Sequence, residues 1–198
     1  MSERLPQDPL KLFQDWLNEA ENSEINDPNA MCLATADSSG KPSARMVLLK
    51  GCDEKGFVFF TNSESHKGRD LSENPEAAFC FYWKSTRKQV RVEGKIEQVS
   101  EKEADDYFAS RPRGSKIGAW ASAQSRPLES REHLENAVKA LEEKYKDQND
   151  IPRPAYWNGY RLVPERIEFW IADIDRLHHR FEYWRENNGK WLAGWLYP

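Results

Sequence analysis

The chain has 198 residues, 31% charged and 38% hydrophobic, with a net charge of −4; this predicts one domain with its own core and argues against a protein that binds nucleic acid mainly through phosphates. No apolar run approaches the roughly 18 residues of a membrane-spanning helix, and residues Met1 to Pro6 lack the pattern of a secretion signal. Because the three widely spaced cysteines, Cys32, Cys52 and Cys80, show neither disulfide nor zinc spacing, we expect a cytoplasmic protein with no membrane or nucleic-acid partner.

The first half of the chain predicts a helix followed by closely spaced strands. Asp8 and Pro9 are typical of a helix start, and apolar residues then recur at helical spacing to about residue 22. Short apolar or alternating runs, separated by turn residues, predict a series of strands with one helix between them. The predicted strands are residues 30–36, 44–50, 57–61, 77–83 and 89–97, and the helix is residues 65–73. Such short connections favour antiparallel hairpins.

The second half of the chain adds helices and the last strands. Ser100 and Glu103 form a capping box that opens the next helix. The remaining predicted helices are residues 101–108, 115–122 and 130–145, and the remaining predicted strands are residues 160–163, 167–172, 177–185 and 190–197. The whole pattern predicts an α+β fold in a single domain over residues 1–198, with an antiparallel barrel and helices packed outside it.

Polar residues near these elements form three groups, and the sequence has no glycine-rich phosphate loop, nucleophile elbow or histidines at metal-ligand spacing. In the first group, Arg45 and Lys50 flank a strand, and their odd separation would place them on opposite faces. In the second, Tyr107 and Arg111 would share a helix face just before Ser115, where a helix start, a hydroxyl and a guanidinium suit a phosphate. Ordinary strand-end cations and a solvated helix cap would produce the same two patterns.

The third group is Arg176, His178 and Arg180, which alternate and would project from one face of a strand. Cations in one row repel one another unless an anion or a carboxylate neutralises them. The row therefore predicts an anion site, although a solvated strand face would have the same pattern.

Together and in this order, the motifs resemble those of the pyridoxine/pyridoxamine 5′-phosphate oxidase family, from about residue 6 to the end of the chain. They are RMVLLK (Arg45–Lys50), YFASRPRGS (Tyr107–Ser115), IGAW (Ile117–Trp120) with Gln124 and Ser125, and IEFW (Ile167–Trp170) with RLHHR (Arg176–Arg180). The resemblance implies a split β-barrel with an antiparallel, Greek-key-like order, an N-terminal helix to about residue 22 and C-terminal strands from about residue 160 that complete the site. It also implies a homodimer with FMN bound at the subunit interface.

The same resemblance implies an enzyme that oxidises pyridoxine or pyridoxamine 5′-phosphate to pyridoxal 5′-phosphate, with O2 as acceptor and release of H2O2. It assigns the substrate phosphate to Lys50, Tyr107, Arg111 and Ser115, and it makes Arg176 and His178 the catalytic, substrate-binding pair at the reacting ring. The FMN-binding residues that it implies are Arg45, Met46, Val47, Leu48, Leu49, Lys50, Phe60, Thr61, His66, Lys67, Gln89, Gln124, Ser125, Trp170 and Arg180. Because the flavin would supply the redox chemistry, no covalent nucleophile is expected.

Four positions depart from the family pattern, and two other functions stay open. His66 stands where Arg is usual, Ile171 replaces a small or polar residue, His179 replaces Asp, Asn or Glu, and Trp195 replaces Arg. A non-catalytic protein that binds flavin or pyridoxal phosphate is one alternative, which the changes at His179 and Trp195 favour. An oxidase of another ring, of the phenazine type, is the second, and the retained phosphate-binding set argues against it.

Overall fold

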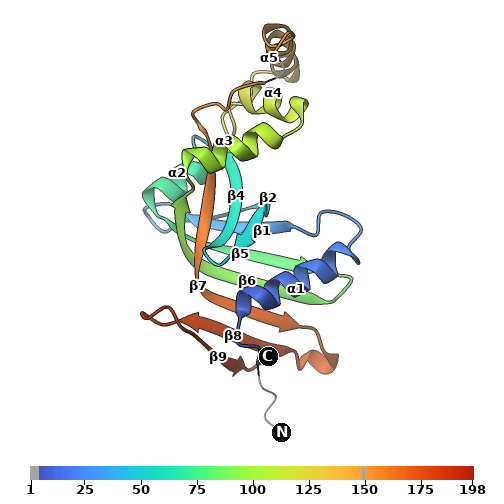
Figure 1. Ribbon diagram of the computed structural model, residues 1–198, viewed down its shortest axis with the longest axis vertical. Helices are drawn as coiled ribbons and strands as arrows, with labels where there is room; N and C mark the ends of the chain where they lie inside the picture. Colours follow the sequence, from blue (N-terminus) through green and yellow to red (C-terminus); the bar gives the residue numbers. More distant parts are fainter. Residues whose placement is uncertain (1–4, 149) are drawn as a thin grey trace.

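One strongly curved antiparallel sheet, with helices around it, makes up the computed structural model, which describes residues 5–148 and 150–198 (Figure 1). The helices are α1 (Pro9–Glu21), α2 (His66–Glu73), α3 (Glu101–Ser110), α4 (Arg113–Ala121) and α5 (Arg131–Lys144), with a 3-10 helix η1 (Ile174–Arg176). The strands are β1 (Ala30–Ala36), β2 (Pro42–Leu48), β3 (Gly51–Asp53), β4 (Gly56–Asn62), β5 (Glu76–Trp83), β6 (Lys88–Gln98), β7 (Trp157–Ile171), β8 (His179–Arg185) and β9 (Trp191–Leu196). The predicted helices are confirmed, with end points that differ by a few residues, and the short strand β3 was not predicted.

The two ends of the curved sheet are joined by the chain at the junction between β2 and β3. Its strand order is β2-β1-β5-β6-β7-β4-β3, and β8 and β9 are joined beyond β7. β3 follows β2 after only Leu49 and Lys50, so the chain itself connects the two ends of this path. The backbone N–H of Lys50 donates to the carbonyl oxygen of Val58 on β4, 2.8 Å away. The curled sheet confirms the predicted split barrel and places Lys50 at its seam.

The long strand β7 connects the barrel to the C-terminal hairpin. It is one strand of 15 residues, so the prediction of two separate strands over residues 160–163 and 167–172 is wrong. The register between β6 and β7 shifts between Glu93 and Gly94, and a Cβ atom on Gly94 would lie 2.1 Å from the carbonyl oxygen of Val163. The absence of a side chain at Gly94 of β6 therefore lets β7 continue past it through a bulge. The first half of β7 pairs with β4 and the second half pairs with β8.

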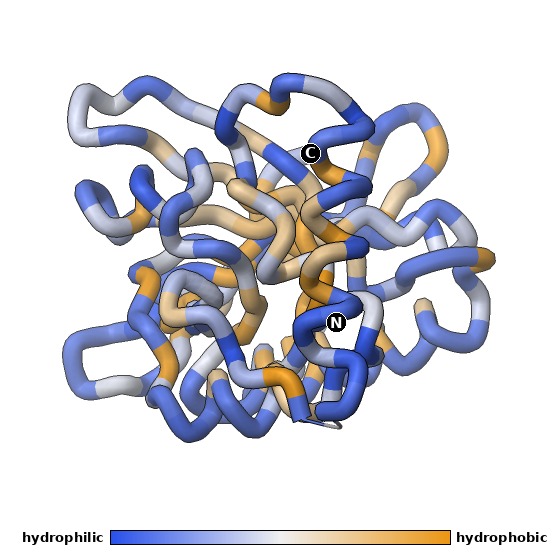
Figure 2. The backbone as a smooth tube through the Cα atoms, turned by 90° about the horizontal axis from the view of Figure 1, so that it is seen from above, coloured by the Kyte–Doolittle hydropathy of each residue, from blue (hydrophilic) through white to orange (hydrophobic). Residues whose placement is uncertain are grey.

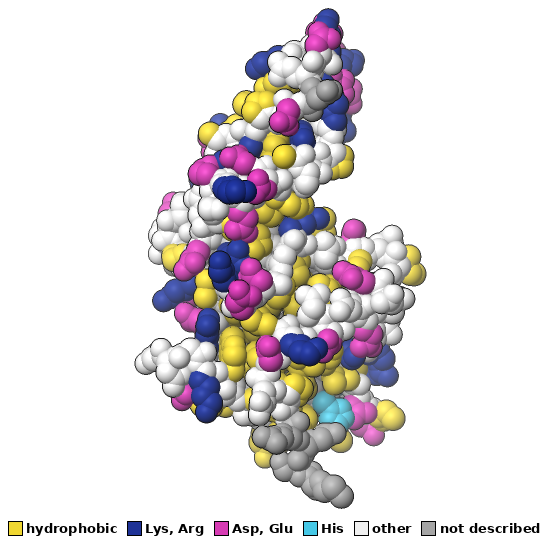
Figure 3. Space-filling view, viewed as in Figure 1, with side chains coloured by type: hydrophobic (Ala, Val, Ile, Leu, Met, Phe, Trp, Pro, Cys, Tyr) yellow, Lys and Arg dark blue, Asp and Glu magenta, His cyan; other side chains and the backbone are white. Residues whose placement is uncertain are grey.

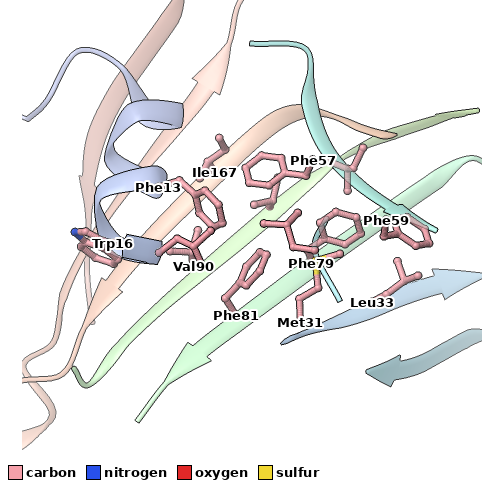
Figure 4. Close-up of a cluster of buried hydrophobic side chains, with 14 of the residues drawn as sticks. Phe13, Trp16, Met31, Leu33, Phe57, Phe59, Phe79, Phe81, Val90 and Ile167 are labelled. Atoms are coloured by element: carbon pink, nitrogen blue, oxygen red, sulfur yellow. The ribbon is translucent and has the colours of Figure 1, made fainter. Parts of the chain in front are cut away.

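Aromatic side chains fill the space between α1 and the sheet (Figure 4). Phe13 of α1 packs against Phe57 and Phe81, with ring centroids 4.8 and 5.0 Å apart, and all three are fully buried. Asp8 fixes the start of this helix, because its Oδ1 accepts two backbone N–H groups of the first turn at 2.9 and 3.1 Å. Each fully buried phenylalanine contributes roughly 1.5–3 kcal/mol of hydrophobic stabilisation. Accordingly, the apolar stretches gather in the middle of the molecule and hydrophilic loops surround them (Figure 2).

The two ends of the molecule differ in structure. Helices α3, α4 and α5 gather at one end, and the hairpin of β8 and β9 lies at the other (Figure 1). On the face that Figure 3 presents, hydrophobic side chains run through the middle, and charged side chains are scattered over the whole face, including the helical end. Within residues 5–148 and 150–198, no helix has the length and apolar character needed to cross a membrane. The three cysteines are free thiols.

Candidate active site

A cavity of about 750 Å³ lies at the barrel seam, bordered by β2, β4, α3 and α4. Residues of the first two predicted groups line it, together with much of the implied cofactor set. The predicted residues that line the cavity are Arg45, Met46, Val47, Leu48, Lys50, Phe60, Thr61, Lys67, Tyr107, Arg111, Ser115 and Gln124. β2 ends at Leu48 and Lys50 lies beyond the strand, and both Arg45 and Lys50 border this cavity.

A buried ammonium group forms one part of the cavity wall. Lys67 lies on α2, whose start is fixed by the Ser65 hydroxyl, which accepts a backbone N–H of the first turn. The Lys67 Nζ lies 2.9 Å from Gln124 Oε1 and 3.2 Å from Thr61 Oγ1, which are both uncharged acceptors. Burial, and after it the positive charge of Arg45, lowers the pKa of Lys67 to about 8. A buried cation among neutral acceptors favours an incoming anion.

The orientation of Arg45 is set by hydrogen bonds across β1. Its Nη1 donates to Thr35 Oγ1 at 2.7 Å and to the carbonyl oxygen of Leu33 at 3.2 Å, and its Nη2 donates to Ser43 Oγ at 2.6 Å. Asp70, which is 4% exposed, accepts the Thr35 hydroxyl at 2.6 Å and lies 3.6 Å from Arg45 Nη2. Burial lowers the pKa of Arg45, and Asp70 opposes this shift. The guanidinium therefore borders the cavity in a fixed position.

Another part of the cavity wall is aromatic and carries a further cation. Tyr107 of α3 stacks on Phe60, with centroids 4.0 Å apart and an angle of 11° between the rings. Trp157 lies parallel to Phe60 at 5.2 Å, and the guanidinium carbon of Arg111 is 4.7 Å from the Trp157 ring. Arg111 caps the end of α3 with an extended backbone, so the prediction that it shares a helix face with Tyr107 is wrong. Ser115 lies in the first turn of α4 and lines the same cavity.

Four predicted residues form a separate cluster, three of them on β6, β7 and β8 and one directly before β8. Gln89 lies opposite Trp170, and Trp170 lies opposite Arg180, in the register of these strands. The His178 ring contacts Trp170 with centroids 4.6 Å apart. Arg180 Nε donates to Glu168 Oε1 at 2.8 Å. None of these described residues lines the cavity at the barrel seam.

Arg176 and His178 precede β8, so the predicted cationic row on one strand face is wrong. Arg176 ends η1 with φ +63°, and Asp175 before it has φ +55°. Left-handed backbone is uncommon for residues other than glycine and is often found at functional sites. His178 Nδ1 accepts the backbone N–H of Asp173 at 3.2 Å. A neutral His178 in this arrangement carries its proton on Nε2, which remains a donor.

The other predicted cofactor residues lie outside the cavity. Leu49 is buried in the hydrophobic core. Ser125 has a left-handed backbone, with φ +68°, directly after Gln124. His66 is exposed on α2, and its Nε2 lies 3.4 Å from Asp70 Oδ1.

The remaining departures from the family pattern lie near the cluster on β6, β7 and β8. Ile171 packs against the core. His179 Nε2 lies 2.9 Å from Asp173 Oδ2. Trp195 is 49% exposed and stands edge-on to Phe181, with centroids 5.4 Å apart.

Comparison with known proteins identifies relatives over almost the whole chain. One family model, described as pyridoxamine 5′-phosphate oxidase, matches residues 17–145, and a second, described as pyridoxine 5′-phosphate oxidase C-terminal dimerisation region, matches residues 157–198. The chain is 57% identical to the pyridoxine/pyridoxamine 5′-phosphate oxidase of Brucella anthropi, over 96% of this chain and 94% of the relative. It is 56% identical to the enzyme of the same name from Gluconobacter oxydans, over 98% and 96%.

Solved structures show the same likeness. PhzG from Burkholderia lata, in complex with tetrahydrophenazine-1-carboxylic acid, aligns with a TM-score of 0.91 and 36% identity, over 98% of this chain and 94% of that chain. A pyridoxamine 5′-phosphate oxidase-related, FMN-binding protein from Nostoc punctiforme aligns with a TM-score of 0.76 and 16% identity, over 98% and 100%. The second likeness shows the fold alone.

Proposed function

We propose, on the premise that this chain belongs to the pyridoxine/pyridoxamine 5′-phosphate oxidase family, that it oxidises pyridoxine or pyridoxamine 5′-phosphate to pyridoxal 5′-phosphate. The matches confirm the family and the class of enzyme that the motifs predicted. Oxidation of the alcohol removes two hydrogen atoms, one from the 4′ carbon and one from its hydroxyl. Oxidation of the amine removes two hydrogen atoms to give an imine, which water hydrolyses to the aldehyde and ammonia. In both reactions O2 gains the two hydrogen atoms and leaves as H2O2. The cysteine spacing supports the cytoplasm as its location.

The donors around the cavity fit FMN. Lys67 and Arg45 supply positive charge, and Thr61 and Gln124 supply a hydroxyl and an amide beside it. A volume of about 750 Å³ lies within the usual range of cofactor and ligand sites. The chemistry that bound FMN would supply is the redox step, in which two electrons and a hydrogen leave the substrate as a hydride and the electrons go on to O2. Lys67 and Arg45 would hold its anionic end, and residues 46–48 border the same cavity.

The main support for a phosphorylated substrate comes from the guanidinium of Arg111. Within the part of the chain that the structure describes, its Nη1 is buried and has no hydrogen-bond partner, and burial lowers the pKa of the group. A buried donor without a partner costs about 1–3 kcal/mol, so an oxygen atom of a ligand would stabilise it. Lys50, Tyr107 and Ser115 line the same cavity and complete a set of donors that suits a phosphate.

The proposed catalytic pair lies in another part of the molecule. Arg176 and His178 belong to the segment of residues 157–198 that matches the dimerisation region, and they are not among the residues that line the cavity. We infer a homodimer in which Arg176 and His178 of one copy reach the cavity of the other, as an isologous interface allows. His178 would donate from Nε2, and the Arg176 guanidinium would stabilise negative charge on the reacting ring.

The test is to purify the protein with FMN and to follow aldehyde formation and H2O2 release from pyridoxamine 5′-phosphate. A yellow protein that forms both products supports the proposal. A protein that binds FMN and forms neither product would support the non-catalytic alternative. One that stays colourless in excess FMN would refute the oxidase and a flavin-binding protein, and would leave only a protein that binds pyridoxal phosphate. Arg176→Ala and His178→Ala should each lower turnover by about 100-fold with unchanged flavin content, and an unchanged rate would remove their proposed roles.

An oxidase of a phenazine-type ring is favoured by one observation, the likeness to PhzG at 36% identity. Identity to the curated pyridoxine/pyridoxamine 5′-phosphate oxidases is higher, at 56% and 57%. Lys50, Arg111 and Ser115 also meet at one cavity, which favours a phosphorylated substrate. The rates with pyridoxamine 5′-phosphate and pyridoxamine separate the two functions, because only the first proposal requires a strong preference for the phosphorylated compound.

A further inference from the structure

Trp157, the first residue of β7, forms a part of the cavity wall that the sequence did not predict. It is 6% exposed and lines the cavity. Its ring is parallel to Phe60 and edge-on to Phe108, with centroids 5.2 and 5.0 Å apart. The guanidinium carbon of Arg111 lies 4.7 Å from the Trp157 ring and 5.4 Å from the Phe108 ring. Two aromatic rings therefore hold the guanidinium of Arg111, the cation proposed to bind the substrate phosphate.

The backbone of Trp157 is itself tied to α3. Arg153 Nη1 donates to the carbonyl oxygen of Trp157 at 2.8 Å and to Asn158 Oδ1 at 3.1 Å. The same side chain donates from Nε to Asp105 Oδ1 at 2.7 Å and pairs through Nη2 with Glu101, and both carboxylates lie on α3. The Arg153 side chain is only 8% exposed. This network fixes Trp157 relative to α3, the helix that ends at Arg111.

A contact with an aromatic ring and a contact with a carboxylate have different consequences for a cation that must bind phosphate. A carboxylate would neutralise Arg111 and would compete with the phosphate for its N–H donors. An aromatic ring attracts the cation through its quadrupole and leaves the donors at the edge of the guanidinium available. The Nη1 of Arg111, buried and without a partner among the described residues, is such a donor.

We propose that Trp157 is a positioning residue for the substrate phosphate, which holds the Arg111 guanidinium in place while leaving its charge and its Nη1 donor available. This inference rests on the proposed function, in which Arg111 binds that phosphate. The phosphate does not react, so its contact with Arg111 is the same before and during the chemical step. Loss of the Trp157 ring should therefore raise the KM for pyridoxamine 5′-phosphate more than it lowers kcat.

The test compares Trp157→Leu, which removes the ring, with Trp157→Phe, which keeps a weaker one, in the flavin-loaded protein. The probes are 4-deoxypyridoxine 5′-phosphate and 4-deoxypyridoxine, which differ only by the phosphate. Both lack the 4′ hydroxyl, so the 4′ carbon cannot be oxidised to an aldehyde. Their dissociation constants are measured from changes in flavin absorbance. We expect the preference for the phosphorylated probe to fall about tenfold in Trp157→Leu and about threefold in Trp157→Phe. Should Trp157→Leu not fold, an unchanged preference in Trp157→Phe would overturn the proposal.

Trp16→Leu is the matched control. Trp16 is also buried, at 7% exposed, and also carries a cation, with Lys88 Nζ 4.8 Å from its ring. It does not line the cavity. This substitution should lower the free energy of unfolding and leave the preference for the phosphorylated probe unchanged.

A double-mutant cycle separates a positioning role from a general structural one. If Trp157 acts through Arg111, Trp157→Leu should cause no further loss of preference in the Arg111→Ala background. An equal loss in both backgrounds, or an equal loss of affinity for both probes, would contradict the proposal. If the proposed oxidase function is wrong, the experiments give a different set of results. In that case the unaltered protein would not oxidise pyridoxamine 5′-phosphate, and the binding ratios would still decide the role of Trp157.

Discussion

Lys67 is the residue whose protonation should control the binding of FMN. Burial, and then the charge of Arg45, lowers its pKa to about 8. The ammonium form attracts the FMN phosphate, and the neutral amine does not. We therefore expect the affinity of the flavin-free protein for FMN to fall as the pH rises from about 7 to about 9, measured by the quenching of flavin fluorescence. Lys67→Met should bind FMN more weakly at the lower pH and lose most of this dependence. A full pH dependence in that variant would assign the titration to another group.

The same pKa shift predicts an opposite effect on the stability of the flavin-free protein. The folded-state pKa of about 8 lies below the ordinary lysine value of 10.5, so the unfolded chain binds more protons between these values. The contribution of Lys67 to the free energy of unfolding therefore rises as the pH increases from about 8 toward 10.5. Urea unfolding across this range should show a steeper rise for the unaltered protein than for Lys67→Met. Parallel curves would mean that Lys67 keeps an ordinary pKa.

Residues that belong to a motif could be predicted, and residues that only support it could not. Arg111 and Ser115 were assigned together from their sequence context, and both line the cavity. Asp70 and Trp157 carry no local signal, because each contacts the cavity cations from another element. Their roles depend on tertiary distances, which the pattern of one segment does not contain.

At the scale of elements, Gly159 determines how β7 packs against β4. It lies opposite Phe60, and a Cβ atom there would lie 2.5 Å from Val99 Cγ2 and 2.6 Å from Phe60 Cε1. Gly159→Ala should therefore displace the Phe60 ring from its stack with Tyr107. We expect a loss of about 1–3 kcal/mol in the free energy of unfolding and a higher KM for pyridoxamine 5′-phosphate, measured by urea unfolding and steady-state kinetics.

Gly114→Ala is the control for this element-scale prediction. Gly114 lies in α4, and a Cβ atom there would meet no atom within 4 Å. Alanine is favoured over glycine in a helix by roughly 1 kcal/mol, so this variant should be as stable as the unaltered protein or more so. If Gly159→Ala proved equally harmless, the Phe60 ring would have room to move and the stack would not depend on the glycine.

The elements themselves show where sequence patterns are sufficient. Apolar periodicity and turn residues predicted the helices and the antiparallel strands, because each pattern extends over a whole element. Alternation failed for Arg176 and His178, since a turn with left-handed residues interrupts the strand there. The sequence pattern also predicted two strands in place of β7. Pro164 and Glu165 look like a break in the strand when the pairing with β6 is not known.

At the scale of the whole molecule, the proposed site is divided between two distant regions of the chain. Arg111 lies in the cavity near α3 and α4, and His178 lies beside β8, near the opposite end of the fold (Figure 1). Neither sequence nor a single copy of the chain brings them together. The proposed homodimer does so, and it makes a prediction that no arrangement within one chain would share.

Mixed dimers of two inactive variants should regain activity. Arg111→Ala removes from the cavity the cation proposed to bind the substrate phosphate. His178→Ala removes the hydrogen-bond donor proposed to come from the other copy. In a mixed dimer, one site carries both substitutions and the other carries neither. After subunit exchange of an equal mixture, half of the dimers are mixed, so about a quarter of the unaltered activity should return. Aldehyde formation from pyridoxamine 5′-phosphate measures this recovery.

A second mixture shows whether recovery comes from shared sites. Arg111→Ala and Ser115→Ala both lie in the cavity of one copy, so every site in their mixed dimer keeps one defect. Exchange between these two variants should leave the activity at the mean of the separate proteins. Recovery in this mixture would point to a general stabilisation by exchange. No recovery in the mixture of Arg111→Ala with His178→Ala, once mixed dimers are detected by mass spectrometry, would place Arg176 and His178 outside the site of the partner copy.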